Sequence, residues 1–251
     1  MHNPRTAVIV IPTFNEASSI GMLLDELVHT VLPATPWDCR VLVVDGNSPD
    51  GTAEIVRKAS RECAGVHLLV EEKKEGLGAA YVKGFRHAVA ELKADAVVEF
   101  DGDLQHPPEV IPRLLAEIDA GADLVLGSRR RPGGSYPKGW SPLRRFLSSV
   151  GGFAARLLLF FPSRLFRAVT DPTTGLKATR VDERFLALDL SALSRGFAYK
   201  LEMLSLLAGA GAVIREVPLA FRLRGGGESK LEGQAPWEIL WTCILLRLRQ
   251  P

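Results

Sequence analysis

The feature that most constrains the fold is a regular alternation of short apolar runs with stretches of helical periodicity. The apolar runs are rich in β-branched side chains and lie at 7–11, 41–44, 66–70, 96–100 and 122–126. Runs of this kind are typical of strands that are buried on both faces. Helical patterns begin near 15, 50, 76 and 107, after the first, second, third and fourth runs. This β-α-β-α order predicts an α/β fold with a mostly parallel sheet flanked by helices.

Polar residues whose side chains could bind a ligand directly follow the expected strands. They are Asn15, Glu16, Asp45, Asp101, Asp103 and Arg129. In doubly wound sheets, ligands bind beyond the carboxyl ends of the strands. We therefore expect these side chains to gather at one edge of the sheet, around a ligand.

The sharpest local pattern is Asp101-Gly102-Asp103 after the fourth apolar run. Two carboxylates separated by one residue can face one hard cation, and Mg²⁺ or Mn²⁺ held in this way commonly bridges to phosphate oxygens. Gly102 permits a close approach of backbone and ligand. Gln105 adds a neutral oxygen, whereas a structural role is preferred for His106. A solvated acidic turn is the alternative interpretation of these residues.

Two further segments could contact a nucleotide. Asp45 could accept hydrogen bonds from a base N–H or a ribose hydroxyl, while Asp50 is predicted to cap the next helix. The segment 74–78 is a weak glycine-rich pattern in which Lys74 and backbone N–H groups could meet a phosphate. A plain helix N-terminus is the favoured alternative for that segment.

Charge is distributed unevenly along the chain. The net charge of +2 does not indicate nucleic-acid binding. No acidic residue occurs between Asp123 and Asp171, a stretch that carries nine basic ones: Arg129, Arg130, Arg131, Lys138, Arg144, Arg145, Arg156, Arg164 and Arg167. Arg129, with Arg144 or Arg145, could hold the phosphate of a second substrate. A solvated basic surface is the alternative for most of the nine.

The second half of the chain indicates contact with a membrane. We expect a mobile loop at 132–142 and basic, apolar helices over 143–168, which could lie on an anionic bilayer or pack in the core. A short extended piece near 171–178, a helix near 199–209, a strand near 213–217 and a helix over 237–249 should follow. No apolar run reaches the roughly 20 residues of a transmembrane helix. We also predict no signal peptide, and the three scattered cysteines indicate a reducing compartment.

Several segments in order resemble a known family. They are IPTFNE (11–16), VDGNSPDGT (44–52), GLG (76–78), DGDLQHPPE (101–109), GSR (127–129), DPTTG (171–175) and GESKL (227–231). The chain is similar to inverting family 2 glycosyltransferases of the GT-A fold, and more narrowly to those that mannosylate dolichyl or other polyprenyl phosphates. The resemblance spans about residues 6–231, and the 101–109 and 227–231 segments are its most specific parts.

The resemblance implies GDP-mannose as donor, a polyprenyl phosphate as acceptor, and Mg²⁺ or Mn²⁺ as cofactor. The residues it implies for the donor are Pro12, Phe14, Glu16, Asp45, Asp101, Gly102, Asp103, Arg224 and Lys230. Asp101, Asp103 and Gln105 would hold the metal. Arg129 and Arg144 or Arg145 would hold the acceptor phosphate. Gly46 departs from the family pattern, which usually has a second acid there, and so does the all-glycine loop before Glu228.

The resemblance also implies an organisation and a location. We expect a GT-A domain over 1–231, with a nucleotide-binding half at about 6–130 and an acceptor half at about 131–231, and a C-terminal amphipathic helix over 232–251. The protein would lie peripherally on the cytoplasmic side of a membrane, and a separate anchoring subunit is a candidate partner. The alternatives are a UDP-sugar such as UDP-glucose as donor, or a non-catalytic subunit that binds nucleotide sugar.

Overall fold

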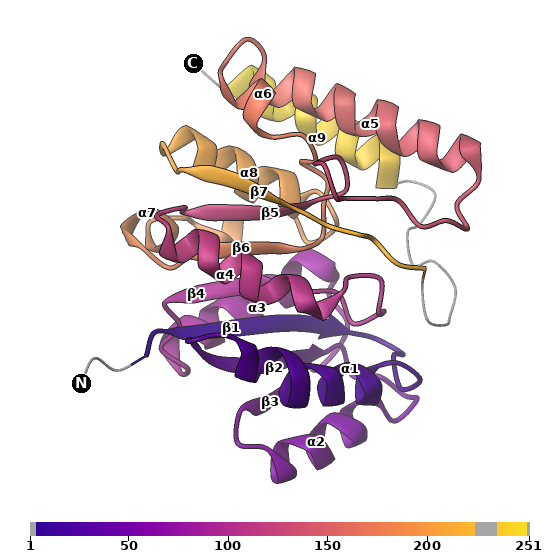
Figure 1. Ribbon diagram of the computed structural model, residues 1–251, viewed down its shortest axis with the longest axis vertical. Coiled ribbons are helices and arrows are strands. Elements are labelled where there is room, and N and C mark those ends of the chain that lie inside the picture. The colour runs from indigo at the N-terminus through magenta and orange to yellow at the C-terminus, as the bar shows by residue number, and fades with distance from the viewer. Residues whose placement is uncertain (1–3, 224–234, 250–251) are drawn as a thin grey trace.

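The computed structural model describes residues 4–223 and 235–249 and forms a seven-stranded sheet between helices (Figure 1). The strands are β1 (Thr6–Thr13), β2 (Asp38–Asp45), β3 (Val66–Val70), β4 (Ala96–Glu99), β5 (Leu124–Ser128), β6 (Lys177–Arg180) and β7 (Ile214–Pro218). Their order across the sheet is β3-β2-β1-β4-β6-β5-β7, and only the pairings of β6 with β4 and β5 are antiparallel. The predicted α/β fold with a mostly parallel sheet is confirmed.

Helices cover both faces of this sheet. The α-helices are α1 (Ile20–Glu26), α2 (Thr52–Glu62), α3 (Leu77–Ala90), α4 (Ile111–Asp119), α5 (Pro142–Phe160), α6 (Leu165–Ala168), α7 (Glu183–Leu186), α8 (Tyr199–Gly209) and α9 (Ala235–Arg249). A π-helical turn, η1 (Leu27–Val31), and 3₁₀ turns η2 (Leu32–Ala34), η3 (Pro108–Val110) and η4 (Leu190–Ala192) complete the set. The predicted basic, apolar segment 143–168 thus forms two helices, α5 and α6.

Alternation along β1 divides the core into two layers. Ala7, Ile9 and Ile11 pack with α1, α2 and α4, whereas Val8 and Val10 pack with α3 and α8 on the other face. Successive side chains of a strand point to opposite faces, so an unbroken apolar run serves both layers. This explains why the strand segments lack the polar alternation of a half-exposed sheet.

Of the boundaries that differ from the sequence-based expectation, two bear on the site. The first helix begins at Ile20 rather than near Asn15, because Asn15 adopts a left-handed conformation with φ 55° in a turn. The fifth strand is Leu124–Ser128 rather than 122–126, and its register with β7 runs to Ser128↔Pro218. The shift brings Arg129 directly beyond the end of the strand.

Helices α5 and α9 lie side by side at one end of the molecule (Figure 1). The C-terminal part of α5 is buried through Ala155, Leu159 and Phe160, while its N-terminal part is exposed. Within residues 4–223 and 235–249, no helix combines the length and hydropathy needed to cross a membrane.

Candidate active site

The topology places the first and fourth strand ends next to each other. The chain runs from β1 outward to β3 and then returns to β4 on the other side of β1. A reversal of this kind leaves a crevice at the carboxyl ends of the two central strands. Thr13 and Gly102 meet there, because a methyl group built on Gly102 would lie 3.3 Å from the Thr13 Cγ2 atom. Sequence segments that were predicted to share one edge therefore do so.

Asp101 follows β4 at this edge of the sheet and lies among groups that favour its ionised form. Its Oδ1 accepts a hydrogen bond from the Tyr81 hydroxyl at 3.0 Å and lies 3.6 Å from the Lys200 ammonium. Burial alone would raise the pKa of Asp101, but the charge of Lys200, the neighbouring His106 and the hydrogen bond from Tyr81 together outweigh it, and the pKa lies below the usual 3.8. Asp101 is therefore a carboxylate at neutral pH, as a metal ligand must be.

Asp103 and Gln105 form the turn that follows. The Asp103 Oδ1 accepts the Gln105 backbone N–H at 3.1 Å, and Leu104 between them adopts φ 63°. The Gln105 amide nitrogen points to the Arg222 carbonyl at 3.4 Å, so the side-chain oxygen is the atom suited to a cation. The donor set of two carboxylates and an amide oxygen fits Mg²⁺ or Mn²⁺. Along residues 4–223 and 235–249, no group of three or more His, Cys, Asp or Glu is arranged for a metal, so substrate oxygens and water would complete the coordination.

His106 has the structural role that the sequence analysis preferred. Its ring is 2% exposed and lies between Phe100 and Phe221, with ring centroids at 5.7 and 5.1 Å. Burial lowers the pKa of His106 to about 4, so the imidazole is neutral at pH 7. It packs the turn from beneath, with its Nδ1 3.6 Å from the Asp101 Oδ2.

The loop after β1 is tied to the Asp101–Asp103 turn and to the end of β2. The Ser19 hydroxyl contacts both the Glu16 carboxylate at 3.1 Å and the Gly102 carbonyl at 2.9 Å. Asp45 is fully buried and accepts the Thr13 hydroxyl at 2.8 Å. Pro12 and Phe14 flank Thr13 at the same strand end. These five donor-binding candidates, Pro12, Phe14, Glu16, Asp45 and Gly102, lie together in the crevice, and their contact with a nucleotide stays a prediction.

Asp45 and Asp50 have different surroundings. The Ser48 amide and hydroxyl donate to Asp45 at 2.8 and 2.7 Å, so this carboxylate also holds its own turn. Asp50 accepts hydrogen bonds from the Thr52 amide and hydroxyl and from the Ala17 amide. It therefore holds the turn before α2 and fastens the β1 loop; its role is structural, as predicted, but the N-cap residue of α2 is Gly51 rather than Asp50.

Arg129 is held by a partner that the sequence analysis did not identify. Its Nε and Nη2 donate to the two oxygens of Asp171 at 2.7 and 2.6 Å. The Arg129 guanidinium lies 5.5 and 5.6 Å from the ring centroids of Tyr136 and Phe221. This fork fixes the direction of Arg129, whose contact with an acceptor phosphate stays a prediction. An acid directly after a long acid-free stretch was the available sequence signal.

The two candidate arginines of α5 differ in the structure. Arg145 donates to the carbonyls of Pro137 and Lys138, both at 3.0 Å, and thereby anchors the preceding loop. The guanidinium of Arg144 lies 4.2 Å above the Trp140 ring. Arg144 is exposed, and no carbonyl contact of its guanidinium is recorded in the described part of the chain, so it is the better candidate for an anion.

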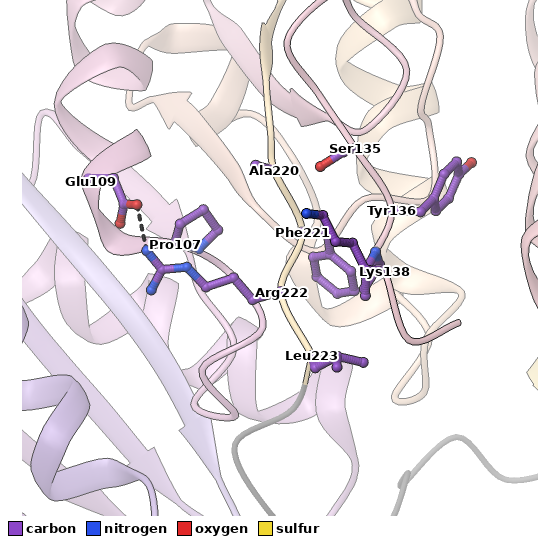
Figure 2. Close-up of a pocket in the computed structure, with 10 residues that line it drawn as sticks. Pro107, Glu109, Ser135, Tyr136, Lys138, Ala220, Phe221, Arg222 and Leu223 are labelled. Atoms are coloured by element: carbon purple, nitrogen blue, oxygen red, sulfur yellow. Dashed lines mark hydrogen bonds and ion pairs between the residues drawn. The ribbon is translucent and has the colours of Figure 1, made fainter. Parts of the chain in front are cut away.

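The predicted mobile loop 132–142 is joined to the segment that follows β7. Ser135 exchanges backbone hydrogen bonds with Leu219 and Phe221. Between this loop and the start of α4 lies a cavity of about 380 Å³ (Figure 2). Pro107, Glu109 and Arg222 form one wall, where Arg222 pairs with Glu109 at 2.5 Å, and Tyr136 and Lys138 lie on the other side. The cavity adjoins the Asp101–Asp103 turn rather than containing it.

Two more residues near Asp101 were missed. Lys200 is 5% exposed on α8, and a lysine near the start of a mostly apolar helix was the signal that could have identified it. Gly175 belongs to the turn before β6, and a methyl group there would lie 2.5 Å from the Asp101 Oδ2. Arg224 and Lys230, predicted to bind the donor diphosphate, lie outside the described residues.

Two proteins named for polyprenyl substrates are similar to this chain over most of its length. The chain is 40% identical over 225 residues to the undecaprenyl-phosphate mannosyltransferase of Micrococcus luteus, covering 89% of this chain and 86% of that protein. It is 35% identical to the polyprenol monophosphomannose synthase of Mycolicibacterium smegmatis, covering 91% and 82%.

Among solved structures, glucosyl-3-phosphoglycerate synthase of Mycobacterium tuberculosis, in complex with Mn²⁺, uridine diphosphate and phosphoglyceric acid, matches with a TM-score of 0.70 at 20% identity. The match covers 98% of this chain and 80% of that one, and at this identity it shows the fold alone. The family model for glycosyl transferase family 2 matches residues 8–179. The chain therefore belongs to glycosyl transferase family 2.

Proposed function

We propose that the protein transfers mannose from GDP-mannose to a polyprenyl phosphate with inversion, giving a β-mannosyl phosphoryl polyprenol. The observation that carries the proposal is the ionised Asp101 beside Asp103 at the switch point of the sheet, in a chain 40% identical to a polyprenyl-phosphate mannosyltransferase. Mg²⁺ or Mn²⁺ bound by Asp101, Asp103 and Gln105 would neutralise the diphosphate of the leaving nucleotide.

The residues of the chain would supply positioning and charge. An acceptor phosphate is an anion near pH 7, so the enzyme needs no strong general base. Arg129, directed by Asp171, and Arg144 on Trp140 would hold that phosphate behind the anomeric carbon. In-line attack then inverts the α configuration of the donor. Asp45, Glu16 and the residues beside them would retain the nucleoside.

The location follows from the substrate. A polyprenyl phosphate resides in a membrane, and the exposed apolar side chains of α5, including Phe146 and Leu147, accompany Arg144 and Arg145 on that helix. We propose that α5 rests on the cytoplasmic side of the membrane. The Asp101 crevice would then meet the lipid phosphate at the bilayer surface. A separate anchoring subunit could share this surface.

A transfer assay tests the proposal. Purified protein, a short polyprenyl phosphate and Mn²⁺ should yield mannosyl lipid from GDP-mannose, with little product from UDP-glucose and none after chelation. Product from UDP-glucose alone would favour the alternative donor, and no product from any donor would favour a non-catalytic subunit.

Asp103→Ala provides the sharper test of the metal site. We expect transfer to fall by at least about 100-fold, since even outer-shell partners of a metal are worth about 10- to 100-fold. The melting temperature should change little, because Asp103 lies in a surface turn. Asp25→Ala is the matched control, since Asp25 is an exposed carboxylate of α1. Normal turnover by folded Asp103→Ala protein would refute the metal assignment.

A further inference from the structure

Three side chains surround the bare backbone of Gly46 at the carboxyl ends of β1, β2 and β3. A methyl group built on Gly46 would lie 3.4 Å from the Phe14 Cδ2, 3.4 Å from the Lys74 Cβ and 3.5 Å from the Glu71 Oε2. Phe14 follows β1, Glu71 and Lys74 both follow β3, and the three side chains meet at the position where Gly46 has no side chain. This position is next to Asp45, a donor-binding candidate of the crevice.

Glu71 brings a buried carboxylate to this position. Its backbone N–H donates to the Asp45 carbonyl at 2.8 Å, which continues the β2–β3 pairing by one residue. Its side chain is 2% exposed, and its Oε1 accepts the Lys83 ammonium at 2.7 Å. Lys83 offsets the charge of Glu71, so the buried carboxylate stays in place. The Oε2 is the oxygen that faces Gly46.

Phe14 provides a flat apolar surface beside that carboxylate. The Lys74 ammonium lies 4.3 Å above the centroid of the Phe14 ring, so the ring face accommodates a group laid upon it. Lys74 is exposed and its side chain is flexible, so it can move off the Phe14 ring with a small loss of free energy. A nucleobase stacks on such a ring whatever its identity. Stacking therefore supplies affinity, and discrimination has to come from the edge of the base.

The chemistry of a carboxylate selects one base. An ionised carboxylate only accepts hydrogen bonds and has about four lone-pair sites, so Glu71 can serve Lys83 and a ligand together. Guanine presents two adjacent donors, N1–H and the 2-amino group. Uracil presents a single N–H between two carbonyl oxygens, and adenine presents an amino group beside an acceptor nitrogen. In uracil and in adenine, an acceptor atom beside the donor would therefore face the carboxylate and be repelled by it.

We infer that Glu71 is the residue that selects a guanine nucleotide, accepting hydrogen bonds from the N1–H and 2-amino groups while the base stacks on Phe14 above Gly46. The inference rests on the proposed function, because it names the determinant of the nucleotide that carries the mannose. It also gives Gly46 a role, since a side chain at that position would stand within 3.5 Å of the Glu71 Oε2, between this oxygen and the base.

Calorimetric binding of GDP, IDP and UDP to the full chain with Mn²⁺ tests this. IDP lacks only the 2-amino group of guanine. The wild-type protein should bind GDP roughly tenfold more tightly than IDP, as expected for loss of half of a bidentate pair, and UDP more weakly still. Glu71→Gln should weaken GDP binding by roughly tenfold and bring the IDP-to-GDP ratio of dissociation constants close to one. Glu72→Gln, the same change at the exposed neighbour, should leave every constant unaltered.

Each outcome decides the matter. Equal affinity of the wild-type protein for GDP and IDP would overturn the inference, even if Glu71→Gln failed to fold. A folded Glu71→Gln variant that kept the wild-type ratio would overturn it too. Mannose transfer from GDP-mannose with equal IDP and GDP binding would leave the proposed function standing without the inference. Glu71-dependent selection of GDP without any transfer would leave the inference standing and remove the proposed function.

Discussion

Asp171 determines the direction of Arg129. It is fully buried and accepts hydrogen bonds from the Nε, the Nη2 and the backbone N–H of Arg129. Its own backbone N–H donates to the buried Glu216 at 2.9 Å. A pair of this kind is costly to break, because removal of one partner leaves the other charge buried and unpaired.

We predict that Asp171→Asn lowers the free energy of unfolding by roughly 3 kcal/mol at pH 7, the lower end for breaking a buried ion pair. Burial would raise the pKa of Asp171, but the hydrogen bonds from Arg129 hold it below 3.8. The stability from this depressed pKa is present above pH 3.8 and is lost as the pH falls through the folded-state value.

Urea unfolding at pH 7 and at pH 3 measures both effects. The loss of stability between the two pH values should be smaller in Asp171→Asn than in the wild-type protein, and Asp25→Asn should behave like the wild type. An equal loss in Asp171→Asn and wild-type protein would contradict a depressed pKa at Asp171.

Helix α5 combines two environments along one element. The exposed apolar residues of its N-terminal two thirds are Leu143, Phe146, Leu147, Val150 and Phe153, whereas Ala155, Leu159 and Phe160 are buried near its end. Of the two alternatives left open by the sequence, a core helix therefore describes the end of α5. The exposed part suits a bilayer surface.

We predict that the double substitution Phe146→Gln and Leu147→Gln lowers binding to vesicles of anionic phospholipid by at least about tenfold, since each side chain removed from water contributes roughly 1.5–3 kcal/mol. Co-sedimentation measures the bound fraction. Leu186→Gln is the control, because Leu186 is a comparably exposed apolar residue on α7. Equal loss in the control, or no loss in the double variant, would show that α5 does not contact the membrane.

At the scale of the whole molecule, the antiparallel strand β6 joins β4 and the strands beyond it to β5 and β7. It pairs with β4 on one side and β5 on the other, and the turn before it presses Gly175 against Asp101. A methyl group at Gly175 would also lie 2.8 Å from the His106 Cε1 and 3.0 Å from the Lys200 Nζ. No L side chain fits there unless the carboxylate moves.

Gly175→Ala should therefore displace Asp101 and reduce kcat/KM for mannose transfer by roughly 100-fold, the cost of a misplacement of about 1 Å. Circular dichroism should show an unchanged secondary structure. Gly209→Ala serves as control, because a methyl group at Gly209 meets no atom within 4 Å. Retention of full activity in Gly175→Ala would mean that the position of Asp101 does not limit the reaction.

The sequence by itself determined the strands, the order of helices, and the placing of Asp45, Asp101 and Asp103 after strand ends. These properties are local, because neighbouring residues determine the side-chain periodicity and the positions at which strands end. The structural role of Asp50 in the turn before α2 followed for the same reason.

Tertiary structure alone decided which groups meet. Lys200 beside Asp101, Asp171 beneath Arg129 and Glu71 beside Gly46 each join segments that only the order of strands across the sheet brings together. The periodicity of the sequence does not predict such contacts between distant residues. These contacts depend on where β4 and β6 enter the sheet and on which side chains fit into the space that remains. Charge, pKa and the selection of a base in the crevice depend on these meetings.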